Sequence, residues 1–375
     1  MNRDCKMKVS TIVVRFAIAA VLVSRLTSHA SPLAAQDSQA PWRLSYFPYF
    51  TVSPNDGLMG IARAIWFRQA EWGDRVTLEN SVAVEAGYST KGSWLARTTW
   101  ANPRLAPGWR VKAHAEAGHE PRFGDPGALI ERDRRLAWVD VTRRLEGPLH
   151  LAVRGGIRHD ELSVPGNLAV EESDATVRGA LILDLRDREF EVNRGVLLEG
   201  GVIFGSAGDD GYRAAYAHLR GWYNPLPYLR LTGRYAWRQR IADDPVAAVH
   251  EFPAWEDQFT TLGGHRSHRG FAIGELGAGG TTFAGVEARF DVINAGEMGA
   301  LTLFAFADGG KVSEFDGVFQ GIPCENYCAA EGRFDWKWAP GGGIALRVLR
   351  AATLTVSAAR TDDRTTWYVG SGWSW

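Results

Sequence analysis

The sequence predicts an all-β fold, and within that class a 16-stranded antiparallel transmembrane β-barrel. Polar and apolar residues alternate in about sixteen segments from residue 42 onward, the chain start is typical of a secreted protein, and the last residues alternate like a strand. The chain has 375 residues, a formal net charge of −1 and 23% charged residues. These values exclude a polytopic helical membrane protein and give no sign of a nucleic-acid surface.

The first residues are typical of a secretion signal. Three basic residues open the chain, and an apolar stretch follows over residues 12–23. That stretch is too short for a spanning helix, which needs roughly 18 apolar residues. Small residues come next, with candidate cleavage sites after Ala30 and near Ala35. We therefore expect a cleaved signal peptide over residues 1–35 and a barrel domain over residues 36–375.

Residues 281–292 illustrate the alternation in the mature chain. Their odd-numbered positions include Glu287 and Arg289, and their even-numbered positions include Val286 and Phe290. A soluble sandwich would turn the polar face to water and the apolar face to a second sheet. Charges this dense on one face favour a closed barrel instead, in which the polar face lines a lumen and the apolar face meets lipid.

The number of segments supports closure. An even number of strands, with the N-terminus on the inner side of the membrane, suits a closed antiparallel barrel, because closure removes the unpaired edges that lipid cannot tolerate. The predicted strands begin near residues 43, 58, 75, 91, 108, 133, 148, 175, 192, 210, 227, 281, 299, 333, 352 and 366.

Connection lengths predict the orientation of the barrel. If the N-terminus is periplasmic, every long connection is expected on the extracellular side, as in outer-membrane barrels. The short turns are expected at 145–148, 224–227, 294–297 and 348–351, and the long connections at 119–132, 159–174, 241–280 and 313–332.

The chain end resembles the signal that outer-membrane proteins present to their assembly machinery. Its pattern is formed by Tyr368, Gly370, Trp373 and Trp375. A strand edge with aromatic anchors can be captured by β-augmentation. The alternative is a soluble sandwich whose last strand is buried; the signal peptide and the strand count favour the barrel.

The longest connection carries the motif LGGHRSHRGFAIGELGAGG over residues 262–280. Its residues 263–264 and 268–271 resemble the inward-folded loop of the BamA/TamA outer-membrane assembly family, also called the bacterial surface antigen family. Two-partner secretion transporters share this loop. Further matches follow the family in order along the mature chain. They are residues 183–187 with 193–195, which resemble a short periplasmic turn, 286–290 and 304–310.

The resemblance implies a loop that folds into the lumen and is held there as a latch. Its residues would be Arg269, Gly270 and Phe271, with Asp308 on the barrel wall as the partner of Arg269. An arginine–carboxylate pair is bidentate and directional, which suits this role. The alternative is that Arg269 is one more solvated loop charge. Because Asp308 shares a strand face with two phenylalanines, we expect those rings to pack beneath the folded loop.

The sequence departs from the family in two respects. Members usually carry periplasmic POTRA domains before the barrel, and we expect none here. His268 stands where an aliphatic residue is usual. The first departure puts a complete assembly or secretion cycle in doubt, because POTRA domains receive the substrate.

Other candidate sites are weak. The glycine-rich stretch 274–280 precedes no helical pattern, so we do not interpret it as a phosphate-binding loop. Two histidines, His265 and His268, lack a third ligand, so we expect no metal and no cofactor. Arg230, Arg234 and Arg238 are interpreted as lumen lining rather than as an anion site. No catalytic residues are identified, and we expect that the protein is not an enzyme.

Cys324 and Cys328 are expected to form a disulfide in a long loop, because signal cleavage would leave them as a pair in an oxidising compartment. The alternatives are free thiols or metal ligands. A loop this short adds at most about 2 kcal/mol to stability. We expect mass spectrometry of the unreduced protein to find no alkylatable thiol, and two alkylatable thiols would contradict the pairing.

Together these observations predict a protein of the bacterial outer membrane that takes part in inserting or translocating proteins, or lipids. The alternative is a passive pore or a structural barrel with a loop-plugged lumen. The expected partners are outer-membrane lipids, the assembly machinery for the barrel's own insertion, and a separate POTRA-containing periplasmic protein. No nucleic acid is expected.

Overall fold

The computed structural model describes residues 40–71, 74–121, 131–163, 170–207, 210–241, 262–275, 280–313, 335–348 and 352–371. Residues Pro41–Trp375 form one compact unit. The candidate cleavage sites at Ala30 and Ala35, the chain-end residues Trp373 and Trp375, and Cys324 and Cys328 lie outside the described residues.

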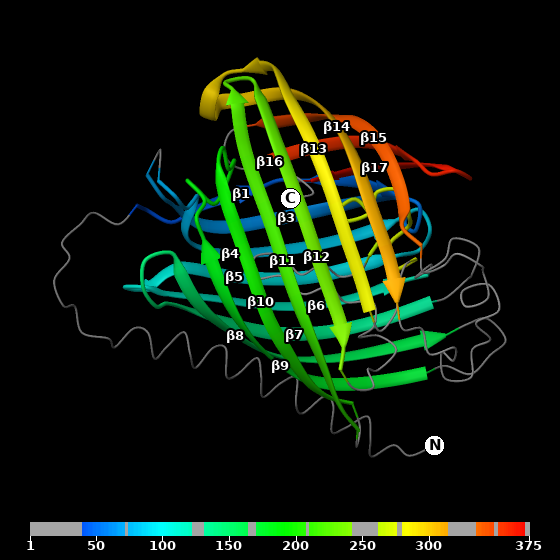
Figure 1. The fold of residues 1–375 in the computed structure, drawn as a ribbon. Helices are drawn as coiled ribbons and strands as arrows, with labels where there is room; N and C mark the ends of the chain where they lie inside the picture. Colours follow the sequence, from blue (N-terminus) through cyan, green and yellow to red (C-terminus); the bar gives the residue numbers. More distant parts are fainter. Residues whose placement is uncertain are drawn as a thin grey trace. The chain divides into compact units, whose positions relative to one another are not determined.

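The described strands form one antiparallel sheet in which strands adjacent in sequence pair with each other (Figure 1). The strands are β1 Arg43–Tyr46, β2 Tyr49–Ser53, β3 Gly57–Gln69, β4 Leu78–Ser89, β5 Trp94–Ala106, β6 Trp109–Glu120, β7 Glu131–Arg144, β8 Leu149–Ser163, β9 Val170–Asp184, β10 Gly195–Ala207, β11 Asp210–Leu226, β12 Leu229–Arg240, β13 Gly280–Asn294, β14 Gly299–Ser313, β15 Lys337–Val348, β16 Ala352–Arg360 and β17 Thr365–Ser371.

The first two segments act as one interrupted strand. Both β1 and β2 pair with β3, and Phe47 and Pro48 separate them. Proline has no backbone N–H to donate, so the ladder breaks at this point. Counted as one strand, β1 and β2 make the structure a closed 16-stranded antiparallel barrel, which confirms the predicted fold class.

The alternation of polar and apolar residues predicted the strand positions accurately. The predicted starts lie within a few residues of the observed ones, and the largest difference is at β9, predicted near 175 and observed from Val170. The faces also agree with the prediction. On β13, Val286 and Phe290 are exposed on the outer surface, whereas Glu287 and Arg289 are buried on the inner one. Apolar residues outside and charged residues inside are the arrangement of a membrane barrel.

The two ends of the barrel differ. We call the end that carries the β12–β13 connection the loop end, and the opposite one the turn end. The four long connections predicted from the sequence all join strands at the loop end. The expectation that every long connection lies there was wrong. Residues 185–194, between β9 and β10, form a ten-residue connection at the turn end.

Helical structure is sparse in the described part of the chain. One 3-10 helix, η2 Gly296–Met298, lies in the β13–β14 turn. No helix among the described residues is long and apolar enough to cross a membrane.

The barrel closes at a narrow seam. The first and last strands lie beside each other (Figure 1), but among the described residues the ladder between β2 and β17 consists of the single residue pair Val52–Val369. By comparison, β8 and β9 pair from Leu149–Leu183 to Leu162–Val170. The described parts of the last two strands span 9 residues in β16 and 7 in β17. In the part of the chain that the structure describes, the sheet therefore has its fewest paired residues where its two ends meet.

Candidate functional site

The described part of the β12–β13 loop, residues 262–275, lies inside the barrel. Most of its side chains are covered, with Leu262, His268 and Arg269 at most 1% exposed, whereas Arg266 is exposed. The backbone turns sharply at Gly263 and Gly264, whose φ angles are +119° and +93°. A Cβ atom at Gly263 would lie 2.0 Å from the carbonyl oxygen of Ala272, so only glycine fits where the two arms of the loop meet.

Arg269 lies against Asp308 on β14. The guanidinium donates from Nε to Oδ2 at 2.7 Å and from Nη2 to Oδ1 at 3.0 Å. The backbone N–H of Arg269 donates to the same carboxylate at 3.1 Å. The two side chains are at most 2% exposed. Three donors of one loop residue thus converge on one wall carboxylate.

A second carboxylate completes the charge balance. Arg269 also donates from Nη1 to Glu287 on β13 at 2.5 Å, and Glu287 accepts from Arg289 at 2.6 Å. Two arginines and two carboxylates therefore form a buried group with no net charge, which offsets the cost of desolvating each ion. Burial alone would lower the pKa of Arg269, but the two carboxylates raise it above its ordinary value. Glu287 had been placed on the lumen face, but its role as a second partner had not been predicted.

Two aromatic rings support this group from the wall. The Cζ atom of Arg269 lies 3.3 Å from the ring centroid of Phe306, a distance at which a cation attracts the face of the ring. Phe304 stacks beside Phe306 with centroids 6.1 Å apart. On β15, Cβ atoms at Gly341 and Gly343 would lie within 2.6 Å of these rings, so glycine makes room for them. This explains why aromatic residues share the inner face with Asp308.

Gly270 sits at the closest approach between the loop and the wall. A Cβ atom there would lie 2.5 Å from Cβ of Ala339 and 2.7 Å from Cγ2 of Thr361. Any larger side chain would push the loop from the wall, so the glycine is required by packing. The next residue, Phe271, places its ring 5.0 Å from Cζ of Arg364 in the β16–β17 turn.

His268 joins the loop to β15. Its Nε2 lies 2.8 Å from the carbonyl oxygen of Lys337, and its Nδ1 accepts from the N–H of Gly270 at 3.3 Å. These partners assign the proton to Nε2. Burial lowers the pKa of His268, which keeps the ring neutral. Gly310 leaves space for the ring, because a Cβ atom there would lie 2.9 Å from its Cδ2.

The last strand also holds the loop. Thr366 donates to the carbonyl oxygen of Gly270 at 3.0 Å, and the hydroxyl of Tyr368 donates to that of Phe271 at 2.5 Å. Tyr368, proposed from the sequence as part of a chain-end signal, is 1% exposed and points inward. Gly370 leaves room for His265 of the loop. These two residues of the signal pattern thus contact the loop, and the pattern's role in assembly stays a prediction.

The loop reaches the first hairpin as well. Asn55, in the turn between β2 and β3, accepts from the N–H of Ile273 at 2.9 Å and donates to its carbonyl oxygen at 3.1 Å. Residues 270–273 therefore contact β17 on one side of the seam and the β2–β3 turn on the other. Asn55 was not identified from the sequence, where it reads only as part of a turn.

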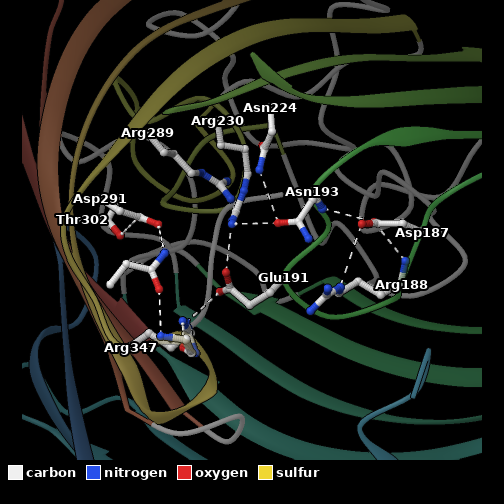
Figure 2. A network of polar contacts seen from close by, with 12 residues as sticks. Asp187, Arg188, Glu191, Asn193, Asn224, Arg230, Arg289, Asp291, Thr302 and Arg347 are labelled. Atoms are coloured by element: carbon white, nitrogen blue, oxygen red, sulfur yellow. Dashed lines mark hydrogen bonds and ion pairs between the residues drawn. The ribbon is translucent and has the colours of Figure 1, made fainter. Parts of the chain in front are cut away.

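A second inward segment lies at the turn end. Residues 185–194, which had been interpreted as a short turn, contact several distant strands (Figure 2). Glu191 accepts from Arg230 of β12 at 3.0 Å and lies 3.5 Å from Nε of Arg347 on β15. Glu189 accepts from both terminal nitrogens of Arg110 on β6, at 2.5 and 2.7 Å. Arg230, which had been interpreted as lumen lining, thus has a carboxylate partner in the lumen.

The histidines of the loop have separate partners. His268 faces Lys337, whereas His265 lies beside Tyr368, with ring centroids 6.3 Å apart. Among the described residues, no group of three or more His, Cys, Asp or Glu side chains is placed to hold a metal.

The comparisons with known proteins agree with this geometry. The model of the Omp85 superfamily domain matches residues 78–349. Among curated proteins, none matches the chain significantly.

Solved structures share the fold at low sequence identity. BamA from Haemophilus ducreyi lacking POTRA domains 1-3 is 12% identical with a TM-score of 0.59, over 90% of this chain and 70% of that one. CdiB from Escherichia coli is 11% identical with a TM-score of 0.54, over 88% and 67%. CdiB from Acinetobacter baumannii is 12% identical with a TM-score of 0.54, over 89% and 65%. The family model covers most of the sequence and the fold agrees with it, so the chain belongs to the Omp85 superfamily.

Proposed function

We propose that this barrel inserts or translocates proteins, or lipids, at the bacterial outer membrane, and that it works through the seam between β2 and β17. The observation that carries the proposal is that, within the described ranges, a single residue pair joins these strands. An incompletely paired edge can accept a strand from another chain, because its free N–H and C=O groups are a template for pairing.

The loop is proposed to act as the latch of this seam. Its wall contacts, from Arg269 to Asp308 and Glu287, fix it to β13 and β14. Its contacts with β17 and with Asn55 lie on opposite sides of the seam. Opening would separate Val52 from Val369 and break the Asn55–Ile273 bonds, while the β17 contacts move with the loop. The loop therefore favours the closed seam and leaves a small number of bonds to break.

The proposed partners follow from this mechanism. Outer-membrane lipids would surround the outer surface, and the assembly machinery would insert the barrel itself. A separate POTRA-containing protein would deliver clients to the turn end. The loop also favours a second candidate, a passive or structural barrel, because it fills part of the lumen beside the wall of β13–β15 with buried side chains.

A disulfide across the seam tests the proposal. Val52→Cys and Val369→Cys, with Cys324→Ser and Cys328→Ser, place thiols on a directly opposed antiparallel pair. Such Cα atoms are about 4.5–5.5 Å apart, a span that a disulfide bridges. Vesicles containing the reduced variant should accelerate the folding of a small unfolded outer-membrane barrel protein. Oxidation should abolish that acceleration, and reduction should restore it.

The matched control places the same cysteine opposite a different strand. Val356→Cys with Val369→Cys joins β16 to β17, away from the seam. This cross-link should leave the activity intact. Equal activity of the oxidised and reduced seam variants would contradict the proposal. Vesicles that give no acceleration in any state would favour the passive barrel.

A further inference from the structure

We propose that residues 185–194 form a second gate, which closes the lumen at the turn end independently of the loop at the opposite end. We call this segment the clasp. It goes beyond the seam mechanism, because it concerns the passage of ions and solutes through the lumen. Three observations carry the inference: its reach across the barrel, its charge pattern and its apolar anchor.

The clasp spans the lumen rather than lining one wall. It connects β9 to β10, and its side chains bind strands spread around the ring. Glu189 binds Arg110 on β6, and Glu191 lies between Arg230 on β12 and Arg347 on β15 (Figure 2). The backbone N–H of Glu189 also donates to the carbonyl oxygen of Arg75, between β3 and β4, at 2.9 Å. A segment tied to such distant strands has to cross the opening.

The charges of the clasp and the wall are complementary. The wall contributes Arg110, Arg230 and Arg347, which meet Glu189 and Glu191 of the clasp, and Arg186 of the clasp pairs with Asp184 at the end of β9. The carboxylates are partly covered, with side chains 17% and 13% exposed. Bidentate arginine–carboxylate contacts hold a segment in a defined orientation. If the clasp moved away, Arg110, Arg230 and Arg347 would lose these carboxylates and face the opening.

The clasp is also anchored by an apolar contact and by its own fold. Val192 is 6% exposed and belongs to a buried cluster with Ala152, Ala180, Ile182, Leu197, Tyr216 and Trp222. Asp187 accepts from the backbone N–H of Asn193 at 3.1 Å, which closes the segment on itself. Gly195, with φ +130°, completes the base, where a Cβ atom would lie 2.4 Å from the carbonyl oxygen of Leu185.

The test uses two obstructions in series. Purified full-length barrels are placed in planar bilayers, and conductance is compared for the wild type, Glu189→Gln with Glu191→Gln, Arg269→Ala, and all three changes together. If the loop and the clasp block one path, opening either one leaves the other in place. Each partial variant should therefore conduct little more than the wild type, and the combined variant severalfold more. The new current should prefer anions, because the arginines of the wall are retained.

A second readout follows the clasp itself. Val192→Cys, with Cys324→Ser and Cys328→Ser, should react slowly with a water-soluble thiol reagent, because Val192 is buried. Adding Glu189→Gln and Glu191→Gln should raise the reaction rate severalfold. The matched control is Glu79→Gln with Glu146→Gln, which removes two carboxylates at the turn end outside the clasp. It should change neither conductance nor labelling.

Two results would overturn the proposal. The first is a combined variant that conducts no more than Arg269→Ala alone. The second is fast labelling of Val192→Cys in the otherwise unchanged clasp, which would show that the segment does not occupy the lumen. A nonselective current would indicate general leakage rather than an opened gate, and would also count against it.

Discussion

Replacing Arg269 by alanine should release the loop from the barrel wall. The change removes two side-chain donors from Asp308 and one from Glu287, and it leaves two buried carboxylates facing a single arginine, Arg289; the backbone N–H that donates to Asp308 remains. Breaking a buried ion pair by removing one partner costs about 3–5 kcal/mol, because a charge is left uncompensated. Asp308→Ala should have a similar effect, because it leaves Arg269 with the already shared Glu287.

Limited proteolysis between residues 241 and 280 measures the release of the loop. A double-mutant cycle then measures how strongly Arg269 and Asp308 are coupled. Each replacement should raise protease sensitivity. The rise in protease sensitivity of the double variant should be smaller than the sum of the two single rises, because neither partner is left as an uncompensated charge. Exchanging the residues, Arg269→Asp with Asp308→Arg, should restore little of the protease resistance. The planar guanidinium needs a defined geometry for its hydrogen bonds, and the exchanged positions do not reproduce that geometry.

Arg266→Ala is the matched control for this cycle. It removes an exposed arginine of the same loop, three residues before Arg269. Because exposed charges contribute little, its protease sensitivity should stay near that of the wild type. Strictly additive effects of Arg269→Ala and Asp308→Ala would contradict the pairing as the hold on the loop.

The strands of this barrel were predictable because their pattern is local. Alternation of side chains along a strand is visible in any short window, as on β13, where Val286 and Glu287 face opposite sides. The seam was not predictable in the same way. The number of residue pairs between β2 and β17 depends on strands at opposite ends of the chain and on the break at Pro48.

The residues of the site could be predicted only where they belong to a motif of the family. Arg269 and Asp308 were identified through the resemblance, and the structure places them in contact. Asn55 and Glu287 were missed, because a turn residue and one of many inner carboxylates carry no local sign of their partner. Tyr368 was read from its place near the chain end, and that place does not reveal its hydrogen bond to the loop.

The clasp was missed for a physical reason as well. Residues 183–187 with 193–195 were interpreted as a short periplasmic turn from the family resemblance, which names no partner for the carboxylates between them. Here the carboxylates meet arginines from strands far away in sequence, such as Arg110 and Arg347. Such a contact can be recognised only once the ring of strands is closed.

The largest consequence expected of the loop is its effect on the seam. Freeing the loop with Arg269→Ala should loosen the contacts of residues 270–273 on both sides, and the described residues of the two strands would then be joined by one residue pair. Asn55→Ala should act more narrowly. It removes the described link to the β2–β3 turn and leaves the loop on β13, β14 and β17. Both variants should therefore open the seam, but only Arg269→Ala should also expose the loop to protease.

The distance across the seam is the most direct measurement of this account. Spin labels at Phe50→Cys and Trp367→Cys, with Cys324→Ser and Cys328→Ser, would lie on the outer surface of β2 and β17, where both native residues are exposed. The wild type should give one short distance, and Asn55→Ala and Arg269→Ala should each add a longer population. Labels at Val356→Cys and Trp367→Cys, both on the β16–β17 pair, should not change. Identical distance distributions in all three proteins would contradict the claim that the loop holds the seam closed.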